Sequence, residues 1–166
     1  MDDTKQSQAV FAAGCFWGVE AAFRNVQGVS DAKVGYIGGT TTAPTYEQVC
    51  TGTTGHAEAV QVTFDPSVVS YEQLLNVFWG SHNPTTLNRQ GPDAGTQYRS
   101  AIFFCDSNQQ KLAEASRDKM QSSDKFSNKI VTEIIQAGEF HLAEEYHQRY
   151  VEKHGGAACN IINHND

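Results

Sequence analysis

The segment AVFAAGCFWGVEAAFRN, residues 9–25, changes its hydrophobic pattern at Gly14. Residues 9–13 form an uninterrupted apolar run with the length of a buried strand, and from Cys15 onward apolar side chains recur at helical spacing. Gly14 therefore marks a turn at which a buried strand passes directly into a helix over residues 15–25. This junction begins an alternation of strands and helices that continues along the chain.

The remaining elements follow from the same kind of pattern. The further predicted strands, from alternating or short apolar runs, cover residues 31–37, 57–65, 98–104 and 129–135. The further predicted helices, from apolar residues at helical spacing, cover residues 71–79, 107–121 and 142–153. The first six elements follow the ferredoxin-like βαββαβ order. We therefore expect an α+β fold with helices on one face of a mixed sheet, extended by a further helix and strand.

Length and composition favour one globular unit. With 166 residues the chain has the size of a single domain, so we expect one domain over residues 1–166, a monomer, with residues 155–166 as a flexible tail. Hydrophobic residues make up 39% and charged residues 19%, which excludes a disordered chain. Twelve Lys and Arg against 19 Asp and Glu give a net charge of −7. This balance argues against a nucleic-acid or anionic-membrane partner.

The sequence also argues against a membrane or exported protein. Its longest apolar run, residues 10–19, has about half the length needed to span a bilayer. Residues 12–15 (AAGC) look like a lipoprotein cleavage site, but the segment before them is acidic and too short for a signal. We therefore expect a cytoplasmic protein whose thiols stay reduced unless they are catalytic or redox-sensing.

Four cysteines occur without a C-x-x-C pair: Cys15, Cys50, Cys105 and Cys159. They are too few for a disulfide-dense scaffold. Cys15 begins the first predicted helix, where the positive end of the helix dipole and free N–H groups favour a thiolate. The alternative is that it is a small buried hydrophobic residue. The adjacent Phe16 and Trp17 either line an apolar pocket beside the thiol or pack in the core.

Glu58 continues the apolar face of a predicted strand. Extending the alternation backwards from Phe64 through Val62 and Val60 reaches this carboxyl group. Burial disfavours the charged form, so we expect a raised pKa and a protonated Glu58 that can donate a proton. The alternatives are that the strand frays into solvent at this position or that Glu58 pairs with an arginine.

Two long loops carry polar side chains suited to a site. Residues 38–55 contain Tyr46, and residues 80–97 contain Asp93 and are followed by Tyr98. Long loops inside a compact domain are usually functional, and tyrosine hydroxyls can donate to a ligand oxygen. The alternative for each residue is an ordinary structural or solvated position in a loop.

The other cysteines and the histidines give weaker signals. Cys159 lies on the tail, from which it can reach a second sulfur as a resolving thiol, or it is inert. Cys105 ends an apolar strand and is typical of a core residue, whereas the position of Cys50 near a loop is ambiguous. The six histidines form no metal-binding motif, and no nucleotide fingerprint is present, so we expect neither metal nor cofactor.

Three motifs in this order resemble the A-type peptide methionine sulfoxide reductases. They are GCFWG (residues 14–18), TGTTGHAE (residues 51–58) and GTQYRS (residues 95–100). The resemblance extends from about Val10 to Cys159. It implies an α/β sandwich with a long coiled C-terminal segment, which agrees with the α+β expectation above.

The resemblance also implies an activity, which is reduction of the S epimer of methionine sulfoxide, free or in proteins. It implies that Cys15 is the nucleophile and that Glu58, Tyr46 and Tyr98 bind and protonate the sulfoxide oxygen. A buried neutral carboxyl group suits that acid role. Asp93 is implied as a further acid at the same site.

Phe16 and Trp17 are implied as the pocket for the methyl group of the substrate. Transfer of oxygen to Cys15 leaves a sulfenic acid, which condenses readily with a nearby thiol. Cys159 is the expected partner in a disulfide that thioredoxin then reduces. The chain departs from the family pattern at Ala43, where asparagine is usual, at Asn83, and at residues 141–142.

Two other functions remain open from the sequence. One is a cysteine hydrolase in which Cys15 pairs with a histidine such as His56 or His147. The other is a module that binds oxidised or apolar side chains through Phe16 and Trp17 without catalysis.

Overall fold

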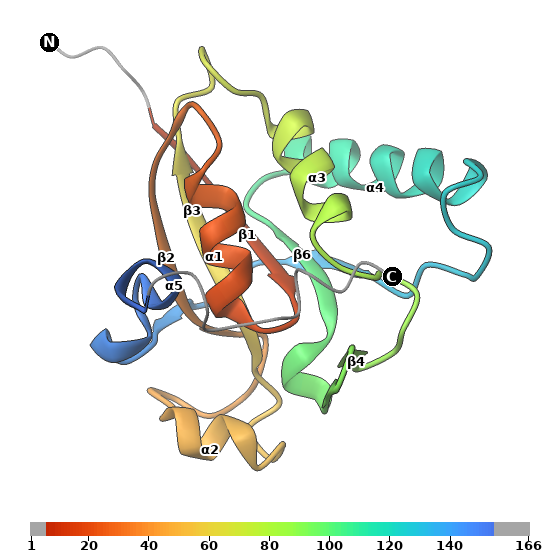
Figure 1. Ribbon diagram of the computed structural model, residues 1–166. Helices are drawn as coiled ribbons and strands as arrows, with labels where there is room; N and C mark the ends of the chain where they lie inside the picture. The colour runs from red at the N-terminus through yellow and green to blue at the C-terminus, as the bar shows by residue number, and fades with distance from the viewer. Residues whose placement is uncertain (1–5, 155–166) are drawn as a thin grey trace, which may run out of the picture.

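The computed structural model describes residues 6–154, and Figure 1 shows its course. The strands are β1 (Ser7–Ala13), β2 (Val29–Ile37), β3 (Ala57–Phe64), β4 (Arg89–Gln90), β5 (Asp93–Ala94), β6 (Ser100–Phe104), β7 (Glu133–Gln136) and β8 (His141–Leu142). The helices are α1 (Phe16–Arg24), α2 (Tyr46–Cys50), α3 (Tyr71–Gly80), α4 (Ser107–Ser122) and α5 (Tyr150–Lys153). Two 3₁₀ turns are η1 (Thr96–Tyr98) and η2 (Glu145–His147).

Six strands form one mixed sheet in the order β7-β6-β1-β3-β2-β8. Neighbouring strands pair antiparallel, except for the parallel pair of β6 and β7. The central order β6-β1-β3-β2, with α1 after β1 and α3 after β3, is that of a ferredoxin-like core. The predicted α+β fold with a mixed sheet is therefore confirmed.

The main core lies between the sheet and helices α1, α3 and α4, which cover the same face (Figure 1). Phe11 of β1 stacks on Phe23 of α1, with ring centroids 5.0 Å apart. It also stacks on Tyr71 and Phe78 of α3, at 5.9 and 5.4 Å. Burial of these rings is the hydrophobic contribution that holds the two helices over the central strand.

The opposite face of the sheet is lined by small side chains and covered by the chain between β7 and β8. Phe140 from this connection packs on a cluster that includes Ala12, Ala59 and Ala101. Gly35 makes the close approach possible, because a Cβ at this position would lie 2.6 Å from the Phe140 ring. The sheet is thus buried on both faces near its centre.

The predicted helix over residues 142–153 is wrong. The chain instead forms β8, then η2, then the short α5, and Arg149 between the last two adopts a left-handed conformation with φ 56°. The side chain of Gln148 bonds the backbone N–H and C=O of Val34 on β2, each at 3.0 Å. Apolar spacing predicted a helix here, but these long-range hydrogen bonds fix an irregular path.

The two long loops contain short elements that the sequence pattern did not predict. Thr45 and Gln48 form a capping box that starts α2 inside the first loop. The second loop contains the β4–β5 ribbon and ends in η1, so the strand predicted from residue 98 begins at Ser100. The strand predicted over residues 129–135 is observed at residues 133–136.

A buried polar chain joins the end of α3 to β6. The Nδ1–H of His82 donates to the backbone carbonyl of Phe78, 2.9 Å away, and Nε2 accepts from the Ser100 hydroxyl at 2.7 Å. Ser100 in turn lies 2.7 Å from the hydroxyl of Thr132. Burial lowers the pKa of His82 to about 4, although the hydrogen bond to the Phe78 carbonyl favours the charged ring and acts in the opposite direction. The ring is therefore neutral at physiological pH.

This neutral histidine predicts a pH-dependent stability. Between pH 6.5 and about 4 the unfolded chain binds a proton at His82 that the folded protein does not, so stability rises with pH across this range and levels off above it. We expect His82 to contribute a loss of about 2 kcal/mol in the free energy of unfolding between pH 7 and pH 5. Urea unfolding of the wild type and His82→Gln at both values measures this difference. Equal losses in the two proteins would contradict the prediction.

The backbone conformation at Ala43 predicts a stabilising substitution. This exposed residue has φ 49°, a left-handed conformation that is unfavourable for alanine and tolerated by asparagine. We expect Ala43→Asn to raise the free energy of unfolding by about 1 kcal/mol. The matched control is Ala115→Asn on the exposed side of α4, which should destabilise by about 0.5 kcal/mol through helix propensity. Thermal and urea unfolding measure both, and destabilisation by Ala43→Asn would refute the argument.

Candidate active site

Cys15 lies at the junction of β1 and α1, as the N-cap residue of the helix. Gly14 before it has φ 99°, and a Cβ there would lie 2.8 Å from the Gln90 side chain. Only glycine lets the chain turn here while the β4–β5 ribbon packs against it. The half-buried Cys15 thiol therefore sits at the positive end of the α1 dipole, a setting that favours thiolate.

Glu58 lies on β3, beside the start of α1 and opposite Tyr36 of β2. Its side chain is 2% exposed, so the strand does not fray into solvent at this position. One carboxyl oxygen accepts a hydrogen bond from the backbone N–H of Phe16 at 3.2 Å. The other accepts from the Gln97 side chain at 3.4 Å. The structure thus brings the carboxyl group of Glu58 to the same helix end as Cys15.

Tyr46 and Tyr98 come from different loops to the surroundings of Glu58. Tyr46 is the first residue of α2, and Tyr98 is the last residue of η1. Burial, and after it the charge of Glu58, raises the pKa of both hydroxyls. Both phenols are therefore neutral donors at physiological pH.

Asp93 lies on β5, close enough to Tyr98 for its charge to contribute to the raised pKa of that hydroxyl. Partial burial raises the pKa of the Asp93 carboxyl group itself. Asp93 therefore lies near the Tyr98 side of the cluster formed by Cys15, Glu58, Tyr46 and Tyr98.

Phe16 and Trp17 occupy different environments. Phe16 is 1% exposed and packs in the core beside Tyr36, with ring centroids 5.7 Å apart. Trp17 is half-buried, stacks on Tyr150 of α5 at 3.8 Å, and donates its indole N–H to Nδ1 of His147 at 2.9 Å. Trp17 is therefore the more accessible of the two, and both rings lie beside His147.

Of the other cysteines, one borders this cluster, one lies elsewhere and one is outside the described residues. Cys50, at the end of α2, has an exposed position, accepts from the Gln97 side chain at 3.4 Å and is hydrogen-bonded to Tyr46. It thus borders the cluster. Cys105 follows β6 and is an exposed residue, so its interpretation as a core residue is wrong. Partial burial of the thiol and the charge of Asp106 raise its pKa. Cys159 lies outside the described residues.

Sequence reasoning missed three residues that organise the cluster. Gln97 donates to both Glu58 and Cys50. The Glu144 carboxylate accepts from the Tyr36 hydroxyl and from the Tyr46 N–H, each at 2.9 Å. Burial opposes the charge of Glu144, but these hydrogen bonds outweigh it and lower its pKa. The third is His147, which the sequence suggested only as a possible partner of Cys15 in a hydrolase and not as a contact of Trp17 and Tyr46.

The histidine required for a hydrolase is not available at Cys15. His56 uses Nδ1 to accept from the Gly39 N–H at 3.0 Å and Nε2 to bond the Thr41 carbonyl at 2.7 Å. His147 uses Nδ1 for the indole of Trp17. Neither ring therefore forms the nucleophile–base pair that a cysteine hydrolase needs.

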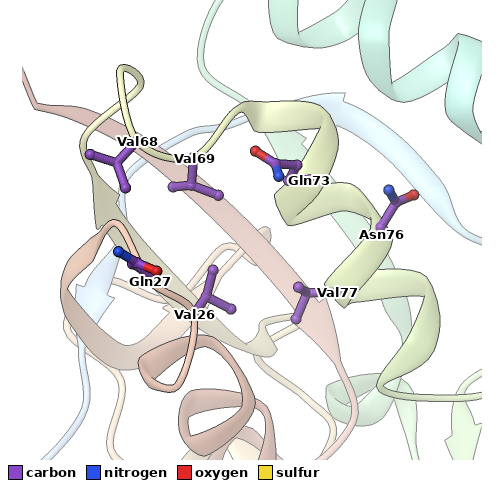
Figure 2. A pocket seen from close by; sticks show the side chains of 7 residues that line it. All are labelled: Val26, Gln27, Val68, Val69, Gln73, Asn76 and Val77. Atoms are coloured by element: carbon purple, nitrogen blue, oxygen red, sulfur yellow. The ribbon is translucent and has the colours of Figure 1, made fainter.

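Two further features are absent from the part of the chain that the structure describes. Residues 6–154 contain no group of three His, Cys, Asp or Glu side chains that could hold a metal ion. In the same residues no helix is long and apolar enough to cross a membrane. A shallow hollow between α3 and the turn after α1 is lined by Val26, Val69 and Val77 among others (Figure 2). It lies at the opposite end of α1 from Cys15.

Comparison with known proteins agrees with this arrangement. The family described as "Peptide methionine sulfoxide reductase" matches residues 7–166. A Methanothermobacter thermautotrophicus protein named peptide methionine sulfoxide reductase MsrA is 56% identical over 159 residues, which are 96% of this chain and 94% of that protein.

Solved structures give the same result. Reduced Mxr1 from Saccharomyces cerevisiae superposes with a TM-score of 0.88 at 38% identity, over 95% of this chain and 91% of that one. Mxr1 in its complex with Trx2 superposes with a TM-score of 0.64 at 27% identity, over 95% and 88%. The chain thus belongs to the peptide methionine sulfoxide reductase family of enzymes.

Proposed function

We propose that this protein reduces the S epimer of methionine sulfoxide, free or in proteins, with Cys15 as the nucleophile and Glu58 as the acid. The observation that carries the proposal is the hydrogen bond from the Phe16 N–H to Glu58, which puts a buried carboxyl group at the helix end where Cys15 lies. Two negative charges at one helix end repel each other, so the pair of groups tends to carry a single negative charge. In the proposed reacting state this charge is on the Cys15 sulfur and the proton is on Glu58.

The reaction needs a proton at the sulfoxide oxygen. Glu58 and the neutral hydroxyls of Tyr46 and Tyr98 bind this oxygen, and Glu58 donates its proton as the Cys15 thiolate attacks sulfur. This attack forms a bond between the Cys15 sulfur and the substrate sulfur, whose oxygen is now a hydroxyl group. The hydroxyl group then passes to the Cys15 sulfur as the S–O and S–S bonds of the substrate sulfur break. Methionine leaves and Cys15 becomes a sulfenic acid, so one thiol is oxidised for each sulfoxide reduced.

The aromatic residues and Asp93 have supporting roles in this proposal. Trp17, together with the buried Phe16 that precedes it, forms an apolar wall for the methyl group of the substrate. The Asp93 charge near Tyr98 helps keep that hydroxyl protonated. The side chain of methionine sulfoxide is uncharged and has one polar oxygen. It therefore suits a site with an apolar wall at Trp17 and hydrogen-bond donors at Glu58, Tyr46 and Tyr98.

Recycling requires a second thiol. We assign this role to Cys159, which condenses with the Cys15 sulfenic acid to give a disulfide and water. A thioredoxin then reduces the disulfide by thiol exchange. The similarity to Mxr1 in its complex with Trx2 supports such a reductant.

The acid role predicts the effect of Glu58→Gln. The amide keeps the size of the side chain but has no proton to transfer, so the single-turnover rate of methionine release should fall about 10²- to 10³-fold. Rapid quench of the reduced enzyme with methionine S-sulfoxide measures this rate. Cys15→Ser is the control and should release no methionine. An unchanged rate in Glu58→Gln would exclude the acid role, and turnover by Cys15→Ser would exclude the proposed function.

The recycling step predicts which disulfide forms. After one turnover without reductant, peptide mapping by mass spectrometry should find Cys15 joined to Cys159. Cys105→Ser serves as the matched control and should leave the map unchanged, because Cys105 lies at the start of α4, away from the cluster. A bond between Cys15 and Cys50 would transfer the resolving role to Cys50, which borders the cluster.

A further inference from the structure

His147 is the point where the aromatic residues of the cluster meet. Its side chain is 1% exposed and belongs to η2, near the C-terminal end of the described chain. Its ring centroid lies 4.4 Å from Tyr46 of α2, and 5.2 and 5.6 Å from Phe16 and Trp17 of α1. One imidazole thus contacts rings from both helices that border the candidate active site.

The hydrogen bond to Trp17 fixes the protonation state of this imidazole. Nδ1 accepts the indole N–H at 2.9 Å, so the ring proton is on Nε2, as in a neutral histidine. Burial lowers the pKa of His147, while the charge of Glu144 opposes this effect. Among residues 6–154 Nε2 has no hydrogen-bond partner. The hydrogen bond at Nδ1 is therefore the polar contact by which His147 holds Trp17.

His147 is held from several sides. The adjacent Gln148 bonds the backbone N–H and C=O of Val34 on β2. The Arg149 N–H donates to the buried Glu20 carboxylate of α1 at 2.9 Å. Glu144, three residues earlier, bonds α2 and β2 through its carboxylate. The imidazole consequently has a fixed position relative to β2, α1 and α2.

Trp17 is held by apolar contacts and by the bond to His147. It is half-buried on the first turn of α1, packs against the main core and stacks on Tyr150. Stacking sets the plane of an indole but lets it slide and turn within that plane. A hydrogen bond at the indole N–H removes this freedom.

We propose that His147 is a positioning residue that holds the Trp17 indole through Nδ1, so that the apolar wall for the substrate methyl group exists before substrate binds. The inference rests on the proposed function, in which Trp17 forms that wall. A wall that is already ordered lowers the entropic cost of binding, so its loss should appear mainly in KM.

The test compares two replacements at position 147. His147→Phe keeps an aromatic ring but removes the acceptor, and we expect KM for methionine S-sulfoxide to rise about tenfold with kcat nearly unchanged. His147→Asn keeps an acceptor near the position of Nδ1 and should restore KM to within about threefold of the wild type. If His147→Phe does not fold, His147→Gln, whose amide lies farther from the indole, replaces it.

A spectroscopic measurement follows the indole directly. In ¹⁵N–¹H spectra the indole resonance of Trp17 should move in His147→Phe and stay near its wild-type position in His147→Asn. Trp79, whose indole donates to the Ser116 hydroxyl at 2.7 Å, is the internal reference and should not move. An unchanged Trp17 resonance in His147→Phe would overturn the inference whether or not the protein is active.

A double-mutant cycle separates the two proposals. Trp17→Phe removes the indole donor, so His147→Phe should add no further rise in KM in that background. Additive effects, or a wild-type KM in His147→Phe where Trp17→Phe raises it, would overturn the role of His147. A wild-type KM in Trp17→Phe would overturn the role of Trp17 as the wall. No sulfoxide reduction by the wild type would overturn the proposed function. In both cases the indole resonance still reports whether His147 positions Trp17.

Discussion

The hydrogen bond from the backbone N–H of Phe16 to the Glu58 carboxyl group joins the first helix to the middle of the sheet. A helix N-terminus has unsatisfied N–H groups, and a buried carboxyl group needs donors, so each satisfies a requirement of the other. The bond also limits the distance between Cys15 and Glu58, because Cys15 directly precedes Phe16. The turn from β1 into α1 that this bond requires also calls for glycine at position 14, where the chain lies against Gln90.

The rest of the cluster is built around this bond by segments without regular structure. Gln97 reaches Glu58 from η1, and Glu144 ties Tyr36 and Tyr46 together from the C-terminal segment. The sheet and the three large helices therefore supply rigidity. The short elements add Tyr46, Gln97 and Tyr98 to Glu58 of β3 and Trp17 of α1, as is typical of sites that loops complete on a rigid scaffold.

The sequence predicted regular structure well and irregular structure poorly. The alternation through Val60 and Val62 correctly placed Glu58 on the helix-covered face, because the period of a strand leaves no other choice. The helix over residues 142–153 was wrong, because hydrogen bonds from Gln148 and Glu144 to distant strands outweigh local spacing. Such bonds leave no trace in local periodicity. The same limit hid the link between His147 and Trp17, which are 130 positions apart.

The irregular segment around residues 144–150 has a consequence for folding during synthesis. Phe16 and Trp17 are made before Glu144, His147 and Tyr150. A chain emerging from the ribosome can pair its first strands and begin its core, since domains fold as they are made. It cannot enclose the surroundings of Cys15 until residue 150 has left the exit tunnel. Until then the Cys15 thiol of the growing chain stays open to whatever oxidant is present.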